Sequence, residues 1–168
     1  MITDYAKVLE VLKSGGVDFI LIGGVAANLH GSARATFDVD VVYSRTRENI
    51  GRLVAALAPF NPYLRGAPPG LPFRFDETTV RNGLNFTLET TLGAVDLLGE
   101  VAGGGNYVQL LAHTVEVEAF GLHCLCVTLE HLIQLKRAAG RPKDLEAIAE
   151  MQALLEQRRQ SAEGNVRP

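Results

Sequence analysis

The chain has 168 residues, 47% of them hydrophobic and 21% charged, which is the composition of one globular domain with its own core. Its net charge of −3 argues against a general nucleic-acid-binding protein, because such proteins carry a basic excess. No apolar run approaches the roughly 20 residues of a membrane-spanning helix, and the first residues lack the features of a secretory signal. Two closely spaced cysteines, Cys124 and Cys126, do not make a disulfide framework. We therefore expect a cytoplasmic protein that makes no membrane contact.

The first part of the chain alternates helical and strand patterns. Apolar residues at helical spacing follow Thr3, which we expect to cap the first helix. A short apolar run bounded by glycines indicates a buried strand, and a later segment alternates carboxylates with valines, as a strand with one polar face does. The predicted elements are a helix after Thr3 that ends at Ser14, a strand over 19–22, a short helix over 25–30, a strand over 37–43 and a helix from Thr46 to Pro59.

The second part begins with a proline-rich segment. Residues 59–72 contain five prolines and two glycines, which predicts a loop that forms a mobile lid or the edge of a cleft. From about residue 157 the sequence turns polar, which predicts a disordered tail over 157–168. Between them we expect strands over 84–90 and 94–98, a glycine loop at 103–105, a strand pair over 114–120 and 122–127, a helix from Thr128 to Gly140 and a last helix that begins at Pro142.

This order of elements predicts an α/β (α+β) fold, in which helices flank a mixed β-sheet. We expect a single domain over 1–156, with its core at 17–98 and C-terminal helices at 128–156. The sequence contains no internal repeat that would indicate a solenoid or a propeller.

Three aspartates form a candidate metal site. Asp38 and Asp40 are two residues apart on one predicted strand, so their side chains lie on the same face. They would repel each other without a cation, and carboxylate oxygens are ligands that Mg²⁺ or Mn²⁺ prefers. Asp96 lies between apolar neighbours on another strand, where a buried carboxylate needs a partner or a metal. The alternative is structural: an Asp-x-Asp pair is often the polar face of a surface strand, and Asp96 would be a strand-end residue held by backbone N–H groups.

Glycines and polar residues near these acids are candidates for phosphate binding. Gly23 and Gly24 follow a buried strand, so their backbone N–H groups can approach an anion without a β-carbon in the way. Ser32 and Arg34 precede the acidic strand and would add a hydroxyl and a guanidinium group.

Other polar residues have a structural interpretation beside a functional one. Lys136 and Lys143 would bind a triphosphate, or would be exposed lysines on a solvated helix face. His30 is expected to end a helix and to bind the backbone. Cys124 and Cys126 lack the further ligands that a metal site would need.

The spacing of these residues resembles a known signature. Gly23-Gly24, thirteen intervening residues, Asp38-Val39-Asp40-Val41 and the later Asp96 look like the polymerase-β-type nucleotidyltransferase superfamily. The stretch 23–40 also resembles small bacterial and archaeal nucleotidyltransferase proteins, which include relatives of the AbiEii-type toxins of toxin–antitoxin systems. The stretch 132–145 is similar to their C-terminal helical segment.

The resemblance, which spans about 17–155, implies a role for each matching position. Gly23 and Gly24 would hold the phosphates of an incoming NTP. Asp38 and Asp40 would bind the metal. Asp96 would bind the catalytic metal and assist deprotonation of an acceptor hydroxyl, which attacks the α-phosphate and releases pyrophosphate. Gly24 departs from the pattern, because many active members have serine there, although the small-protein subgroup often has two glycines.

Two functions fit this sequence. The first is an enzyme that uses Mg²⁺ or Mn²⁺ to transfer NMP from an NTP to a hydroxyl, with RNA, a protein or a small molecule as the acceptor. The resemblance to the AbiEii-type toxins implies that such an enzyme could be the toxin or enzyme part of a toxin–antitoxin system, with a cognate partner. The second is a catalytically idle nucleotidyltransferase-like module that binds or regulates within a toxin–antitoxin pair. Three mutually repelling carboxylates favour the enzyme, since an idle scaffold does not need them.

Overall fold

The computed structural model describes residues 2–165 of the chain. Its main sheet contains β1 (Phe19–Ile22), β2 (Asp38–Tyr43), β3 (Tyr63–Leu64), β4 (Asn85–Thr90), β5 (Gly93–Leu98), β8 (Thr114–Ala119) and β9 (Leu122–Val127). A separate small hairpin pairs β6 (Glu100–Val101) with β7 (Gly105–Asn106). The α-helices are α1 (Tyr5–Ser14), α2 (Gly23–Leu29), α3 (Arg47–Leu57), α4 (Glu77–Asn82), α5 (Tyr107–Leu110), α6 (Leu129–Ala139) and α7 (Pro142–Gly164). Short 3₁₀ turns follow α3 at Ala58–Phe60 and α5 at Leu111–His113.

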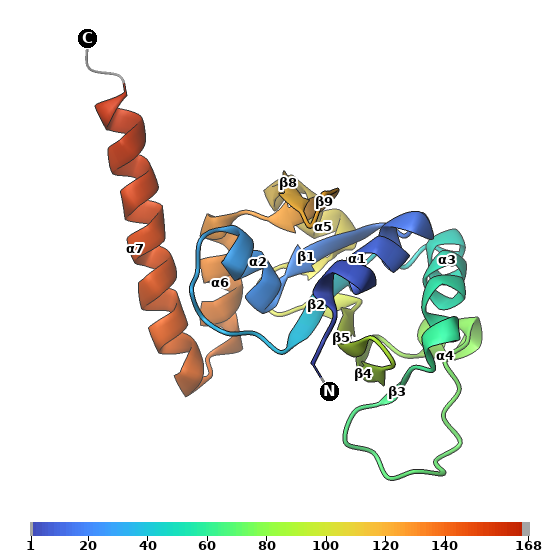
Figure 1. Ribbon diagram of the computed structural model, residues 1–168. Coiled ribbons are helices and arrows are strands. Elements are labelled where there is room, and N and C mark those ends of the chain that lie inside the picture. Colours follow the sequence, from blue (N-terminus) through green and yellow to red (C-terminus); the bar gives the residue numbers. More distant parts are fainter. Residues whose placement is uncertain (1, 166–168) are drawn as a thin grey trace.

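The main sheet has seven strands in the order β3-β4-β5-β2-β1-β9-β8 (Figure 1). Strand β2 runs antiparallel to β1 and parallel to β5, and β9 runs parallel to β1. The hairpins β4–β5 and β8–β9 extend the sheet on its two sides. This confirms the expected mixed sheet with flanking and C-terminal helices.

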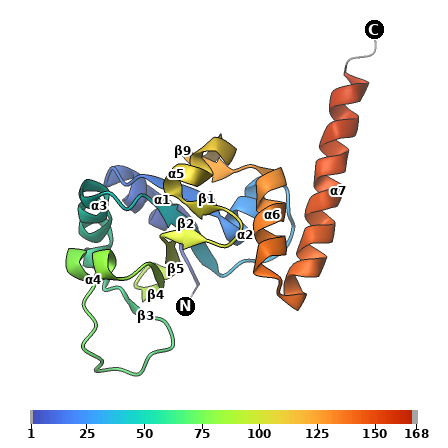
Figure 2. The same ribbon diagram turned by 180° about the vertical axis from the view of Figure 1, so that it is seen from behind.

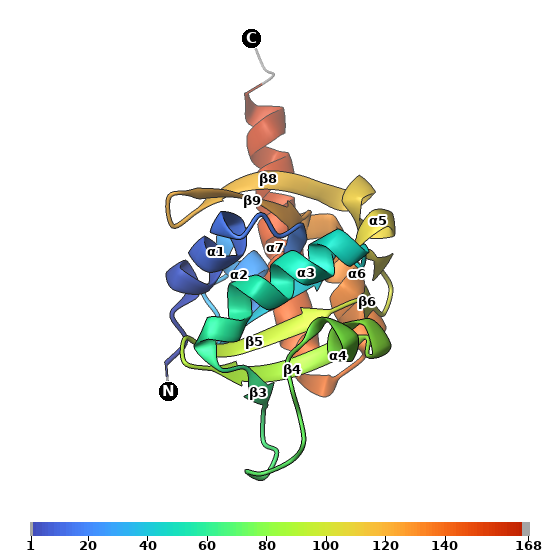
Figure 3. The same ribbon diagram turned by 90° about the vertical axis from the view of Figure 1, so that its right-hand side faces the viewer.

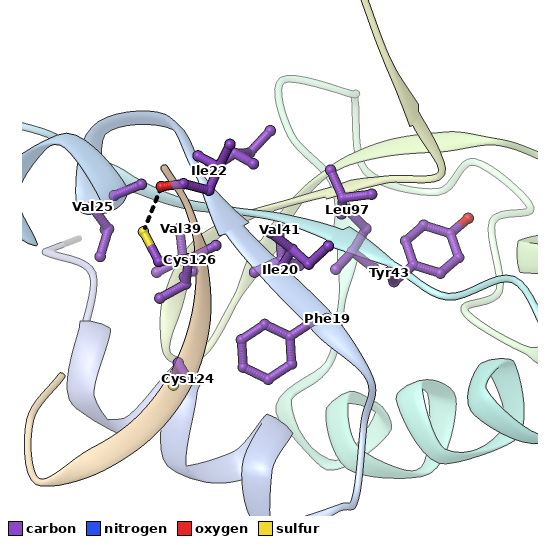
Figure 4. Packing of buried hydrophobic residues seen from close by; sticks show 14 of the residues in the cluster. Phe19, Ile20, Ile22, Val25, Val39, Val41, Tyr43, Leu97, Cys124 and Cys126 are labelled. Atoms are coloured by element: carbon purple, nitrogen blue, oxygen red, sulfur yellow. Dashed lines mark hydrogen bonds between the residues drawn. The ribbon is translucent and has the colours of Figure 1, made fainter. Parts of the chain in front are cut away.

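Helices cover both faces of the sheet. In Figure 3, α1 and α3 lie in front of the strands, whereas α6 and α7 lie behind them. Because β1 is covered on both faces, each of its four residues is buried, which explains why its sequence is apolar throughout. Figure 4 shows Phe19 and Ile20 of this strand and Val41 of β2 among the buried hydrophobic residues of the core. The result is one continuous core on which the central strands are fixed.

The start of the chain is held differently from the prediction. Asp4, not Thr3, caps α1 by accepting a hydrogen bond from the backbone N–H of Lys7. The buried Thr3 hydroxyl instead donates to the carbonyl of Phe37 (2.7 Å) and accepts from the N–H of Ala94 (3.0 Å). Thr3 therefore links the entries of β2 and β5, the two strands that carry the aspartates.

The proline-rich segment is more ordered than a plain loop. Residues 63–64 form β3 and pair with β4, so part of the predicted loop belongs to the edge of the sheet. Helices α4 and α5 were not predicted, because each is too short to show a helical repeat of apolar residues. Likewise, the predicted glycine loop at 103–105 contains the start of β7.

The expected disordered tail is also wrong for most of its length. Helix α7 continues to Gly164 and extends beyond the rest of the protein in Figures 1 and 2. Strong helix formers such as glutamate, glutamine, arginine and alanine sustain it there without an apolar stripe. Arg158 on this part donates to the carbonyl of His30 (3.0 Å), which ties α7 to the end of α2. Residues 166–168 of the predicted tail lie outside the described residues. Within residues 2–165, no helix is both long and apolar enough to cross a membrane.

Candidate metal and nucleotide site

Asp38, Asp40 and Asp96 come together on one face of the sheet. The first two project from β2, and the parallel register of β2 and β5 places Asp40 opposite Asp96. One carboxylate oxygen from each residue lies within 4.8 Å of the others. The local alternation of β2 explains the first pair, whereas the third carboxylate arrives through a strand pairing that spans more than fifty residues of sequence.

The environment of this acid triad, as we call Asp38, Asp40 and Asp96, disfavours three negative charges. Burial, followed by the nearby charges of Asp38 and Asp96, raises the pKa of Asp40 to about 7. Burial also raises the pKa of Asp96, and the guanidinium of Arg65 opposes that increase. A site of this kind gains stability from a cation that neutralises the carboxylates.

The glycine turn, which is formed by Gly23 and Gly24, lies directly against the triad. Gly23 begins α2 with φ +68°, a conformation that side-chain-bearing residues rarely adopt. A β-carbon on Gly23 would collide with the Asp40 carboxylate, and one on Gly24 would collide with the Thr36 hydroxyl. Both positions therefore require glycine, since a side chain there would overlap Asp40 of β2 or Thr36 just before it.

All of the predicted site residues line one cavity of about 590 Å³. They are Gly23, Gly24, Ser32, Arg34, Asp38, Asp40, Asp96, Lys136 and Lys143. One part of the wall is apolar and is formed by Ala27 of α2 with Leu132, Leu135, Ala147 and Met151 of α6 and α7. The cavity thus joins an acidic end, a set of cations and an apolar recess.

The cations at the joint between α6 and α7 are organised by a buried carboxylate. Asp144 accepts a hydrogen bond from Nε of Arg141 (2.9 Å), and its Oδ1 lies 3.5 Å from Nζ of Lys136. Burial of Asp144 opposes its ionisation, but the Arg141 hydrogen bond and the two positive charges together lower its pKa. Lys136 is therefore a largely buried, paired residue, which excludes the alternative of an exposed helix lysine, whereas Lys143 is exposed on the first turn of α7.

Arg34 and Ser32 lie on the segment between α2 and β2. The Ser32 hydroxyl accepts from the backbone N–H of Arg34 (3.2 Å), and Asn28 holds the carbonyls of both residues. The Arg34 guanidinium lies 3.5 Å from the exposed Glu146 of α7, with 43% of the Arg34 side chain accessible. An exposed pair of this kind is weak, so Arg34 is available to a ligand in the cavity.

Sequence reasoning missed Arg65. Its Nη2 lies 2.7 Å from Oδ1 of Asp96, its Nη1 lies 3.6 Å from Oδ2 of Asp38, and its Nε lies 3.6 Å from Oε2 of Glu89. Arg65 is the single charged residue within 59–72, a feature that could have drawn attention to it. Its position beside the triad depends on the β3–β4 pairing, which the sequence pattern did not reveal.

His30 and the two cysteines have structural positions. Nε2 of the buried His30 lies 2.7 Å from the carbonyl of Val127, so the expected helix-end residue bound to the backbone is found. Cys124 and Cys126 are buried in the core (Figure 4), and Sγ of Cys126 donates weakly to the same carbonyl (3.4 Å). Burial raises the pKa of the Cys126 thiol to about 12, which keeps it in the unreactive protonated form.

Comparison with solved structures identifies the fold. The chain is similar to the lincosamide antibiotic adenylyltransferase LnuA in its lincomycin-bound form, with TM-score 0.59 and 16% identity over 91% of this chain and 98% of that one. It is also similar to a putative nucleotidyltransferase from Thermotoga maritima, with TM-score 0.56 and 19% identity over 89% and 94% of the two chains. A third similar structure is the antibiotic-resistance factor ANT(2'')-Ia, with TM-score 0.51 and 14% identity over 95% and 92%.

The protein has a nucleotidyltransferase fold. At the level of sequence, no protein-family model and no curated protein matches the chain. These structures share the fold that the resemblance implies, and a relationship to the AbiEii-type toxins is not shown.

Proposed function

We propose that this protein is a metal-dependent nucleotidyltransferase that moves NMP from an NTP to a hydroxyl acceptor and releases pyrophosphate. The observation that carries the proposal is the convergence of Asp38, Asp40 and Asp96 beside a glycine turn in one cavity. The nucleotidyltransferase fold supports it independently of these residues.

The donor atoms of the triad fit a hard divalent cation. Three carboxylates supply oxygen ligands of the kind that Mg²⁺ and Mn²⁺ take, and burial makes their charges costly without one. Asp38, Asp40 and Asp96 would hold the ion. When bound, a divalent cation neutralises phosphate charge and orients the α-phosphate for in-line displacement.

The remaining residues of the cavity would bind the nucleotide. The backbone at Gly23 and Gly24 approaches the phosphates without steric hindrance from a β-carbon. Ser32 and Arg34 on one side, and Lys136 and Lys143 on the other, supply hydrogen-bond donors and positive charge to the triphosphate.

The transfer itself needs a base near the acceptor hydroxyl. Asp96 would take the hydroxyl proton as the oxygen attacks the α-phosphorus and the bond to the pyrophosphate oxygen breaks. Its raised pKa suits this role, because a base works best when its pKa approaches the working pH. The products are the nucleotidylated acceptor and pyrophosphate.

The acceptor class is best sought among small hydroxylated molecules. Two of the similar structures are a lincosamide antibiotic adenylyltransferase and an antibiotic-resistance factor. The net charge of −3 gives no general attraction to RNA. RNA and protein acceptors, and a role as the toxin of a toxin–antitoxin pair, stay predictions of the sequence resemblance.

The test is incubation of the protein with each α-³²P-labelled NTP, Mg²⁺ or Mn²⁺, and panels of aminoglycosides, lincosamides, other small alcohols, tRNA and proteins. We expect label transfer to at least one acceptor class, dependent on metal and absent from Asp40→Asn. Metal-dependent NTP binding without transfer to any acceptor would support the alternative, an idle nucleotide-binding module. No transfer to any acceptor, together with NTP binding that does not depend on metal, would exclude the enzyme.

A further inference from the structure

A guanidinium group occupies the position where the triad needs a cation. Arg65 contacts two of the three carboxylates, at 2.7 Å from Asp96 and 3.6 Å from Asp38. Its side chain is 29% accessible, so the pairing lies partly out of water, where charge interactions are strong. The two contacts use different guanidinium nitrogens, Nη2 for Asp96 and Nη1 for Asp38, so one planar group spans the gap between the carboxylates.

Arg65 comes from a part of the sheet where its side chain can move without breaking the fold. It follows the two-residue edge strand β3, and its backbone N–H donates to the carbonyl of Thr87 (3.0 Å). After Gly66 the chain leaves the sheet as the long loop below β3 and β4 in Figure 3. The backbone anchor at Thr87 does not involve the guanidinium, so the side chain can change partners while β3 stays paired.

A second set of partners is already beside the guanidinium. Nη2 also donates to the carbonyl of Leu88 (2.9 Å), and Nε lies 3.6 Å from the Glu89 carboxylate. Nε is buried and has no hydrogen-bond partner among residues 2–165. A small rotation toward Glu89 would satisfy that nitrogen and free the oxygens of Asp38 and Asp96.

We infer that Arg65 is the counter-ion of the acid triad in the metal-free protein and competes with the divalent cation for Asp38 and Asp96. This inference rests on the proposed metal site. Arg65 stabilises the metal-free protein by neutralising the triad, and the same contacts weaken metal binding because they must be released first. Arg65 is thus a positioning residue that sets the metal concentration at which the site fills.

The direct test measures Mn²⁺ affinity by calorimetry and by electron paramagnetic resonance, without nucleotide, in the wild type and in Arg65→Met. We expect Mn²⁺ to bind Arg65→Met on the order of tenfold more tightly, with Arg65→Lys between the two. The matched control is Arg52→Met, which removes an arginine that pairs with Asp18 outside the cavity and should leave the affinity unchanged.

Thermal unfolding supplies the second measurement. Arg65→Met should lower the midpoint of the metal-free protein, and saturating Mn²⁺ should remove that difference. An unchanged or weaker Mn²⁺ affinity in Arg65→Met, or a loss of stability that is equal with and without Mn²⁺, would overturn the inference. If Mn²⁺ binds the wild type but not Asp40→Asn, the proposed metal site is supported, whether or not Arg65→Met changes the Mn²⁺ affinity. If Mn²⁺ binds none of these proteins, the proposed metal site and the Arg65 inference both fail.

Discussion

Gly23 lies so close to Asp40 that no side chain fits between them. The backbone of Gly23 has φ +68°, and an added β-carbon would overlap the Asp40 carboxylate. The start of α2 and the middle of β2 therefore lie so close that position 23 has no room for a side chain. This contact places the glycine turn and the acid triad in one site.

Gly23→Ala should abolish metal-dependent NTP binding. It should also lower the free energy of unfolding by more than the ~1–2 kcal/mol of left-handed backbone strain alone, because the methyl group displaces Asp40. Gly121→Ala is the matched control, since Gly121 has φ +78° but open space around a β-carbon. Denaturant unfolding and nucleotide titration check both variants. Equal behaviour of the two would show that the contact with Asp40 has no special role.

Asp96→Asn should lower the transfer rate by a factor of about 10²–10⁴, the usual contribution of a general base, while the protein stays folded. The amide keeps the shape of the side chain but cannot accept the proton. Glu10→Gln is the control, because it changes an exposed carboxyl on α1 that does not line the cavity. Single-turnover rates with labelled NTP are measured for Asp96→Asn and for the control. A rate for Asp96→Asn close to that of the wild type would rule out Asp96 as the general base.

The raised pKa of Asp40 gives the metal-free protein a defined pH dependence. Between its ordinary value of 3.8 and the folded value of about 7, the native protein binds more protons at Asp40 than the unfolded chain does. The free energy of unfolding should therefore fall as the pH rises through this range. The buried His30, whose pKa is lowered chiefly by burial, contributes with the opposite sign near its ordinary value of 6.5.

The contribution of Asp40 is isolated by comparing the wild type with Asp40→Asn in EDTA at pH 5 and pH 8. The variant should be the more stable protein at pH 8, and the advantage should shrink toward pH 5. Glu10→Gln, which changes an exposed carboxyl on α1, should show no such trend. The same advantage of Asp40→Asn at both pH values would contradict the raised pKa.

The two lysines should separate nucleotide binding from stability. Lys136→Met leaves the buried Asp144 without one of its two cations, so it should reduce stability as well as NTP affinity. Lys143→Met removes an exposed charge at the cavity and should reduce NTP affinity alone. Nucleotide titration and urea unfolding of both variants provide the check; an unchanged NTP affinity in both would remove the lysines from the site.

Asn49 tests the packing that supports the site from the far end of β1. Its buried side chain accepts from the N–H of Asp18 (2.7 Å) and donates to the carbonyls of Asp18 (3.0 Å) and Ser44 (2.8 Å). Asn49→Ala leaves these backbone groups unsatisfied, which should cost about 2–3 kcal/mol of stability. Urea unfolding measures the loss, and Arg52→Ala on the same helix is the exposed comparison. If Asn49→Ala lowers the free energy of unfolding less than Arg52→Ala does, the hydrogen bonds of Asn49 do not stabilise the fold.

Local patterns predicted much of the fold because several elements depend on local chemistry. The apolar run of β1 and the alternation of Asp38 and Asp40 on β2 are visible in the sequence, and so is the Thr128 cap of α6. The cap at Thr3 was predicted wrongly because its hydroxyl is used by partners at residues 37 and 94. Such long-range bonds leave no local pattern.

In the site, too, some features follow from local sequence patterns and others depend on long-range contacts. Gly23 and the Asp38–Asp40 pair follow from adjacent segments, whereas the position of Arg65 depends on how an edge strand pairs with β4. Asp96 was predicted from the cost of burying a carboxylate, and its pairing with Asp40 became visible only in the register of β2 and β5. Helix α7 was cut short in the prediction because an exposed polar helix and a disordered polar tail have similar compositions.

The most direct measurement is transfer of label from an α-³²P-labelled NTP to a hydroxyl acceptor, with wild type and Asp40→Asn assayed in Mg²⁺ or Mn²⁺ and in EDTA. We expect a labelled acceptor and pyrophosphate from the wild type with metal, and neither product from Asp40→Asn or in EDTA. Transfer that continues at the same rate in EDTA or in Asp40→Asn would contradict a metal-dependent reaction at this triad.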